Sequence, residues 1–121
     1  MHTSITVDEA CELSKRKAAV VFLDVREPDE CEVISIEGSM FLPLHKLVEE
    51  FDTLKLEKDK TVICVCRSGR RSSIAAEFLR SQGITALNLE GGMRDWAKHR
   101  YSEGLISDED YKKISAFLGQ H

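Results

Sequence analysis

The sequence predicts an α/β fold, in which a parallel sheet is flanked by helices on both faces. Short runs of apolar and β-branched residues alternate along the chain with segments whose apolar residues recur at helical spacing. This alternation is typical of a parallel sheet, because each parallel strand needs a crossover, usually a helix, to return the chain. Two of the runs, Ala19–Leu23 and Thr61–Val65, are apolar or β-branched throughout, as expected of central strands buried on both faces.

The predicted strands are short, and turn or helix signals bound them. Pro43 closes one of them, and the pair Gly91-Gly92 follows another. In chain order, the predicted strands are a short edge strand at Ile5, then Ala19–Leu23, Met40–Leu42, Thr61–Val65 and Thr85–Leu89.

The predicted helices begin at capping residues or at proline. Thr6 and Glu9 form a capping-box signature, and Pro28 suits the first position of a short acidic helix that runs to Val33. The helix that follows Cys66 ends at Gln82-Gly83. An amphipathic helix over 44–54 is expected to bury Leu44, Leu47, Val48, Phe51 and Leu54. A last helix opens at Ser107, stops at Gly119 and is expected to bury Tyr111, Ile114, Phe117 and Leu118.

Length and charge restrict the possible functions. The 121 residues suit one domain over residues 1–121, large enough to fold without disulfides or a structural metal. The formal net charge of −4 argues against general nucleic-acid binding. The start of the chain lacks a signal-peptide pattern and no apolar run approaches the length of a membrane span. We therefore expect a cytoplasmic protein that binds neither nucleic acid nor membrane.

The four cysteines are expected to stay free thiols, because a reducing compartment disfavours disulfides. Cys11 and Cys31 are interpreted as small, partly buried hydrophobic residues. Cys64 lies inside a predicted strand, which favours a place in the core over a role as a second reactive thiol. Because the sequence has no Cys-x-x-Cys pair and no second ligand cluster, it predicts no metal site, and no cofactor is expected.

The segment Cys66–Ser72 joins a predicted strand to a predicted helix. In such a layout, the loop amides and the positive end of the helix face whatever the loop holds, which favours negative charge. Gly69 permits the backbone dihedrals that a cradle of amides requires, and Ser68 and Ser72 supply hydroxyl donors. Ser72 is also expected to cap the helix.

Three arginines lie within five residues of this cysteine. Helix N-termini and neighbouring cations commonly lower the pKa of a thiol, so Cys66 is expected to be substantially ionised at neutral pH. Arg67 and Arg70 are candidates for binding an anionic donor at the rim. Arg71, at the start of the helix, is expected either to be held inward by an acidic partner or to contact the substrate.

Three segments converge at the carboxyl edge of the predicted sheet. Asp24, Cys66 and Gly91 all fall there, and ligands of open α/β sheets bind at that edge. Asp24 and Arg26 are expected to support the site through an ion pair or by fixing a turn. Gly91 and Gly92 are expected to allow a close backbone approach beside the cysteine loop.

The pattern Cys66-x-x-Gly69-x-Arg71-Ser72 resembles the active-site loop of the rhodanese family of sulfurtransferases. Two further segments, Leu23–Glu27 and Leu89–Trp96, are similar to other signatures of that family. Their order and spacing agree over roughly residues 4 to 100, so the resemblance covers most of the chain. The resemblance is weaker at Ser35–Ser39, where family members often show His-Ile-Pro-Gly-Ala. This departure concerns the packing of one connection rather than sulfur transfer.

The resemblance implies a rhodanese-like fold and a specific chemistry. Cys66 would accept a sulfane sulfur from thiosulfate or a similar donor, become a persulfide, and pass the sulfur to a thiol, cyanide or protein acceptor. The loop residues 67–72 would bind the substrate. The physiological donor and acceptor, the pathway and the oligomeric state stay open.

Two other functions fit the same residues. Cysteine phosphatases of related fold use a similar thiolate and arginine cradle, but they place five residues between Cys and Arg. Cys66 and Arg71 enclose four, which gives a ring that suits a sulfur atom better than a tetrahedral phosphate. A rhodanese-like module without turnover is the other alternative, either as a binding module or as a persulfide relay that receives sulfur from a protein.

Overall fold

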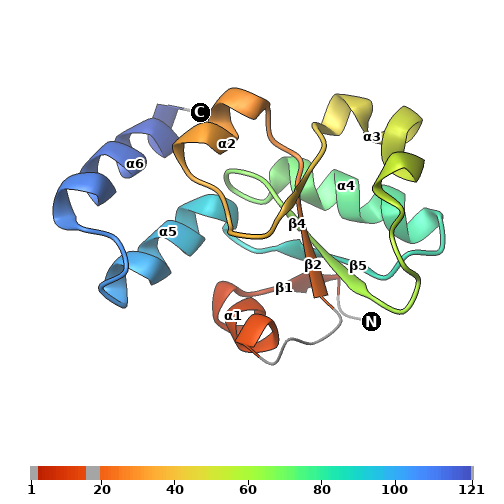
Figure 1. The fold of residues 1–121 in the computed structure, drawn as a ribbon, viewed down its shortest axis with the longest axis horizontal. Helices are drawn as coiled ribbons and strands as arrows, with labels where there is room; N and C mark the ends of the chain where they lie inside the picture. The colour runs from red at the N-terminus through yellow and green to blue at the C-terminus, as the bar shows by residue number, and fades with distance from the viewer. Residues whose placement is uncertain (1–2, 16–19, 121) are drawn as a thin grey trace.

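The computed structural model describes residues 3–15 and 20–120 of the chain. Its strands form one five-stranded sheet in the order β1-β5-β4-β2-β3 (Figure 1). Every described pairing between neighbouring strands is parallel, which confirms the predicted fold class. The strands are β1 (Ser4–Ile5), β2 (Val20–Asp24), β3 (Met40–Phe41), β4 (Thr61–Val65) and β5 (Ala86–Leu89).

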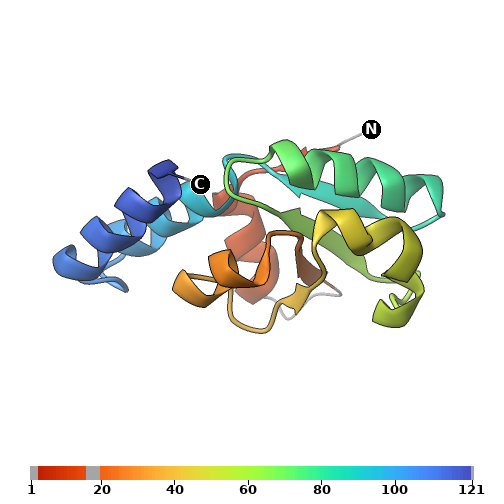
Figure 2. The same cartoon turned by 90° about the horizontal axis from the view of Figure 1, so that it is seen from above.

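Helices cover both faces of the sheet. In both views, α6 lies alongside α5 at one end of the molecule (Figure 1 and Figure 2). None of the helices in the described part of the chain is long and apolar enough to cross a membrane. The helices are α1 (Val7–Lys15), α2 (Pro28–Val33), α3 (Leu44–Glu50), the 3₁₀ turn η1 (Phe51–Leu54), α4 (Arg70–Ser81), α5 (Gly92–Ser102) and α6 (Asp108–Gln120).

Side chains of the central strands alternate between two hydrophobic cores. Phe22 and Ile63 are partners in the β2–β4 register and pack in the core that α1, α5 and α6 close. Their neighbours Leu23 and Cys64 are also register partners, and they pack in the core that α3 and α4 close. Because successive side chains of a strand point to opposite faces, the continuous apolar runs supply both cores at once.

Three predicted helical features are wrong, and one predicted residue is not described. The α-helical part of the segment 44–54 ends at Glu50 and continues as the 3₁₀ turn η1. Val48 is 66% exposed, because it lies about 100° around the helix from the buried Leu47. Gly119 lies within α6 rather than ending it, since it does not take the left-handed conformation of a terminating glycine. Ala19, the predicted first residue of β2, lies outside the described residues.

The connection Ser35–Ser39 contains a buried hydroxyl where the rhodanese pattern carries alanine. Ile36 is buried, and the amide of Ser39 donates to its carbonyl at 3.1 Å, which closes a turn around Gly38. The Ser39 hydroxyl oxygen is buried, and no group in the described residues forms a hydrogen bond with it. A buried polar group without a partner destabilises the folded state.

Replacing this hydroxyl is therefore expected to stabilise the protein. Ser39→Ala should raise the free energy of unfolding by about 1 kcal/mol, because it removes a desolvated group at little cost in packing. Ser107→Ala is the matched control. The Ser107 hydroxyl accepts the amide of Asp110 at 3.1 Å and caps α6, so its loss should lower the free energy by about 1 kcal/mol. Urea denaturation measures both, and equal destabilisation by the two variants would contradict the argument.

Candidate active site

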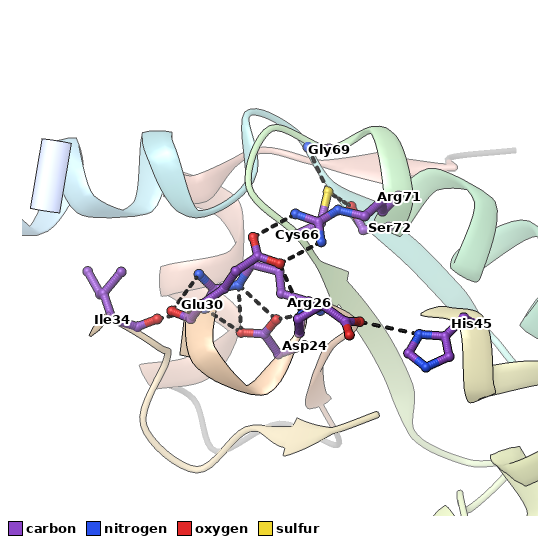
Figure 3. Close-up of polar contacts among 10 residues, drawn as sticks. Asp24, Arg26, Glu30, Ile34, His45, Cys66, Gly69, Arg71 and Ser72 are labelled. Atoms are coloured by element: carbon purple, nitrogen blue, oxygen red, sulfur yellow. Dashed lines mark hydrogen bonds and ion pairs between the residues drawn. The ribbon is translucent and has the colours of Figure 1, made fainter. Parts of the chain in front are cut away.

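Cys66 lies directly after β4, in the loop that leads into α4 (Figure 3). The loop turns at Gly69, whose φ of 104° is in the left-handed region that favours glycine. The first helical residue, Arg70, follows at once. Just 1% of the surface of Cys66 is exposed, so the loop surrounds the sulfur.

Hydrogen bonds hold Cys66 Sγ inside this loop. The Gly69 amide donates to it at 3.1 Å, and the Ser72 hydroxyl oxygen lies 3.2 Å from it. Burial by itself raises the pKa of the thiol, but bonds from the Ser72 hydroxyl and from the amides of Ser72, Gly69 and Ser68 outweigh burial and lower it. The thiolate therefore persists at lower pH than an ordinary cysteine thiolate and is lost as the pH falls through this lowered pKa.

The predicted direction of the pKa shift is confirmed, but its cause differs. Neighbouring arginines were expected to contribute, whereas the main groups that lower the pKa of Cys66 are hydrogen-bond donors. The charge of Arg71 is already matched by a carboxylate, Glu30, which limits its effect on the sulfur. Local amides and one hydroxyl therefore account for most of the lowering of the Cys66 pKa.

Ser72 does not cap α4, contrary to the prediction. Gly69 occupies the N-cap position, and Ser72 is the third residue of the helix, with no exposed surface. The first four amides of a helix have no acceptor within the helix. The Ser72 amide is one of these, which leaves it available to Cys66 Sγ.

The start of α5 fixes the outer side of the cysteine loop. The amide of Met93 donates to the carbonyl of Cys66 at 2.8 Å, and the amide of Arg94 donates to the carbonyl of Arg67 at 3.1 Å. In a trans peptide, the carbonyl and the following N–H point in opposite directions. With the Arg67 carbonyl turned to α5, the Ser68 amide is turned to the thiol, as its effect on the pKa of Cys66 requires.

Glycine at position 92 makes this approach possible. A Cβ at Gly92 would overlap the carbonyl oxygen of Cys66 and would lie 2.7 Å from that of Arg67. Gly92 also has a φ of 53°. The neighbouring Gly91 has a φ of 74°, and a Cβ there would overlap the Asp95 carboxylate. The predicted close backbone approach is therefore present at Gly92, whereas a Cβ at Gly91 would meet a side chain of α5.

Asp24 and Arg26 form the expected ion pair at the end of β2 (Figure 3). Arg26 Nε donates to Asp24 Oδ1 at 2.9 Å and Nη2 donates to Oδ2 at 2.7 Å. Both residues are 1% exposed. Arg26 also donates to the carbonyls of Glu30 at 3.4 Å and Ile34 at 2.6 Å, so the buried guanidinium secures the end of α2.

Arg71 is held inward by an acidic partner, Glu30 of α2 (Figure 3). Arg71 Nη1 donates to Glu30 Oε1 at 2.7 Å and Nη2 donates to Oε2 at 2.9 Å. This bidentate bond lowers the pKa of Glu30. Burial acts in the opposite direction, and a hydrogen bond from the Glu27 amide lowers the pKa further. Of the two alternatives expected for Arg71, the structure shows the pairing with an acidic partner.

The remaining loop residues differ in how they are held. Arg67 donates from Nη1 to the carbonyl of Leu118 at 3.3 Å, so α6 contacts the loop. Ser68 and Arg70 are exposed, and in the described part of the chain neither side chain forms a hydrogen bond or an ion pair. Arg70 is thus the loop arginine whose guanidinium is available at the rim.

The Rhodanese-like domain family model matches residues 6–99 of the chain. The chain belongs to the rhodanese-like family. A rhodanese-related protein from Thermoplasma volcanium has a similar structure, with a TM-score of 0.73 and 36% sequence identity over 81% of this chain and 93% of that one.

Relatives of this rhodanese-like chain are named sulfurtransferases. It is 34% identical over 80 residues to the thiosulfate sulfurtransferase PspE of Escherichia coli, covering 66% of this chain and 77% of that protein. It is also 34% identical over 86 residues to a probable adenylyltransferase/sulfurtransferase, MoeZ, of Mycobacterium tuberculosis. That match covers 70% of this chain and 21% of the length of MoeZ.

The other cysteines of this rhodanese-like chain have environments unlike that of Cys66. Burial raises the pKa of Cys64 to about 12, and burial followed by the charge of Asp24 raises the pKa of Cys31 to about 11. Burial also raises the pKa of Cys11. All four thiols are free in the structure, and the described residues contain no group of three side chains suited to a metal ion.

Two residues of the site were not identified from the sequence. Glu30 comes from α2, and its partner Arg71 is distant in sequence, so the sequence indicated an acidic partner without naming it. Asn88 of β5 lies with its Oδ1 2.5 Å from the Ser72 hydroxyl oxygen. A polar residue between Leu87 and Leu89 in a predicted strand is the signal that could have indicated Asn88.

The contact between α5 and the loop can be tested by adding one methyl group. Gly92→Ala should displace the loop carbonyls and disturb the amide cradle, raising the pKa of Cys66 by about one unit and moving the midpoint of its alkylation pH profile up by the same amount. Gly38→Ala is the matched control, since Gly38 also has a positive φ of 82° but has no atom within 4 Å of the added Cβ. It should cost about 1 kcal/mol of stability and leave alkylation unchanged. Normal alkylation in Gly92→Ala would show that α5 does not shape the cradle.

Proposed function

We propose that this chain is a sulfurtransferase that carries a sulfane sulfur on Cys66 as a persulfide. The single observation that supports the proposal best is the sulfur's setting, inside a ring of donors that lower its pKa at the carboxyl edge of a rhodanese-like sheet. Thiosulfate is the donor we favour, because the relative PspE is named a thiosulfate sulfurtransferase. The acceptor is a thiol or cyanide.

In the first step, the Cys66 thiolate attacks the outer sulfur of thiosulfate. A sulfur–sulfur bond forms to Cys66, the sulfur–sulfur bond of thiosulfate breaks, and its electron pair leaves with sulfite. Arg70, exposed at the rim, is suited to bind the anionic donor and the departing sulfite. The amides and the hydroxyl that face Cys66 Sγ are suited to stabilise the negative persulfide that remains.

In the second step, a nucleophilic acceptor attacks the terminal sulfur of the persulfide. The bond between the two sulfurs breaks, and its electron pair returns to Cys66 as the thiolate. Cyanide would leave as thiocyanate, and a thiol would leave as a persulfide. The same donors that lower the pKa of Cys66 make this thiolate a good leaving group, because they stabilise its charge.

The state of Arg71 supports sulfur transfer over phosphate chemistry. In a phosphatase cradle, the arginine offers its donors to the phosphate oxygens, but both terminal nitrogens of Arg71 donate to Glu30. The four residues between Cys66 and Arg71 also give a smaller ring than the phosphatase pattern. Both features favour a single sulfur atom as the group that the loop holds.

Turnover of two substrates distinguishes these chemistries. With thiosulfate and cyanide, the full chain should form thiocyanate, and it should release no phosphate from an aryl phosphate. Cys66→Ala should reduce thiocyanate formation to the uncatalysed rate, because the sulfur carrier is gone. Cys64→Ala is the matched control and should keep at least about half of the activity, since its thiol is buried and protonated.

Three results would overturn the proposal. Phosphate release that depends on Cys66, without thiocyanate, would make the chain a phosphatase. Equal loss of thiocyanate formation in both variants would remove the assignment to Cys66. Absence of both activities in the folded wild-type chain would favour a module that does not turn over small molecules.

A further inference from the structure

Asn88 is a polar residue in a parallel strand whose neighbours are leucines. It lies in β5, beside Cys64 of β4 in the strand register. Its Oδ1 is 2.5 Å from the hydroxyl oxygen of Ser72, which in turn is 3.2 Å from Cys66 Sγ. A Cβ on Gly69 would lie 3.4 Å from Asn88 Nδ2. The Asn88 amide therefore lies between the Ser72 hydroxyl and the turn of the cysteine loop.

The Ser72 hydroxyl has one proton and two potential acceptors. A serine hydroxyl donates one hydrogen bond, so it cannot donate to Asn88 Oδ1 and Cys66 Sγ at the same time. When Ser72 donates to Asn88 Oδ1, its oxygen is free to accept the proton of a Cys66 thiol. When Cys66 is a thiolate, Ser72 must instead donate to the sulfur, and Asn88 must then offer a donor to Ser72.

A half-turn of the Asn88 amide satisfies both states. It exchanges Oδ1 for Nδ2 beside Ser72 with little change in shape, because the two groups have nearly equal size. Within residues 3–15 and 20–120, Nδ2 has no hydrogen-bond acceptor, so no second bond holds the amide in one orientation. Asn88 can therefore match either protonation state of the sulfur through Ser72.

We propose that Asn88 is a positioning residue that acts through Ser72, turning its amide to match Cys66 as a thiol or as a thiolate. The inference rests on the proposed function, in which Cys66 attacks the donor as a thiolate and leaves the persulfide as a thiolate in the second step. With the amide nitrogen toward Ser72, a chain of two hydrogen bonds ends on the anionic sulfur, and each bond strengthens the other.

The charged groups around Cys66 are not part of the hydrogen-bonded series that runs from Asn88 through Ser72 to Cys66 Sγ. Arg71 is paired with Glu30 of α2, and Arg67 and Arg70 belong to the loop itself. Asn88 makes no hydrogen bond to any of these groups in the described residues. A substitution of Asn88 thus changes the hydrogen-bond partner of the Ser72 hydroxyl without breaking an ion pair.

The test is a double-mutant cycle between Asn88 and Ser72 in the full chain. The pH dependence of iodoacetamide alkylation, resolved by mass spectrometry for each cysteine, measures the pKa of Cys66. Asn88→Asp should raise this pKa by about one unit, because a carboxylate accepts the Ser72 proton and offers none in return. In a Ser72→Ala background, the same substitution should shift the pKa by less than half as much.

Asn88→Leu keeps the branched shape of the side chain and adds no charge, so it serves if the aspartate variant does not fold. This variant should raise the pKa of Cys66 by less than Asn88→Asp does, and it should leave the pKa unchanged in the Ser72→Ala background. An equal shift in both backgrounds, for whichever variant folds, would show a direct effect of residue 88 and overturn the proposal, as would no shift in either. Alkylation does not require sulfur transfer, so failure of the proposed function would be seen separately, as absence of thiocyanate formation in the wild-type chain.

Discussion

The conformation of the cysteine loop depends on hydrogen bonds made on its outer side. Two amides at the start of α5 donate to the carbonyls of Cys66 and Arg67, and the second of these bonds turns the following amide, that of Ser68, inward to the sulfur. Gly92 is the residue that permits this contact, because any side chain would meet those carbonyls. The lowered pKa of this buried thiol therefore depends on backbone contacts from α5.

Alternating charges connect the end of β2 to the same loop. Asp24 binds Arg26, Arg26 holds the carbonyls at the end of α2, and α2 presents Glu30 to Arg71 (Figure 3). Each of the two pairs is bidentate, so the orientation of each guanidinium is defined as well as its distance. A buried pair of this kind contributes more to geometry than to net stability, since desolvation offsets much of the attraction. Its role here is to keep the start of α4 in place while the loop amides hold the sulfur.

The sequence was sufficient for features that are local in the chain. The strand before Cys66, the turn at Gly69 and the order of strands and helices follow from residues that are close in sequence. Glu30 and Asn88 were not identified, because their roles arise when α2 and β5 pack beside the loop, which neither spacing nor composition encodes. Val48 shows the same limit in a helix, where periodicity indicates an apolar side but not how much of it the sheet covers.

A transferable sulfur on Cys66 can be detected by site-resolved mass spectrometry of the full chain, after incubation with thiosulfate and removal of the excess. One added sulfur is expected on the peptide that contains Cys66, and it should disappear on addition of cyanide with release of one thiocyanate. A sulfur on Cys64, or an unmodified Cys66 in a folded chain, would contradict this expectation.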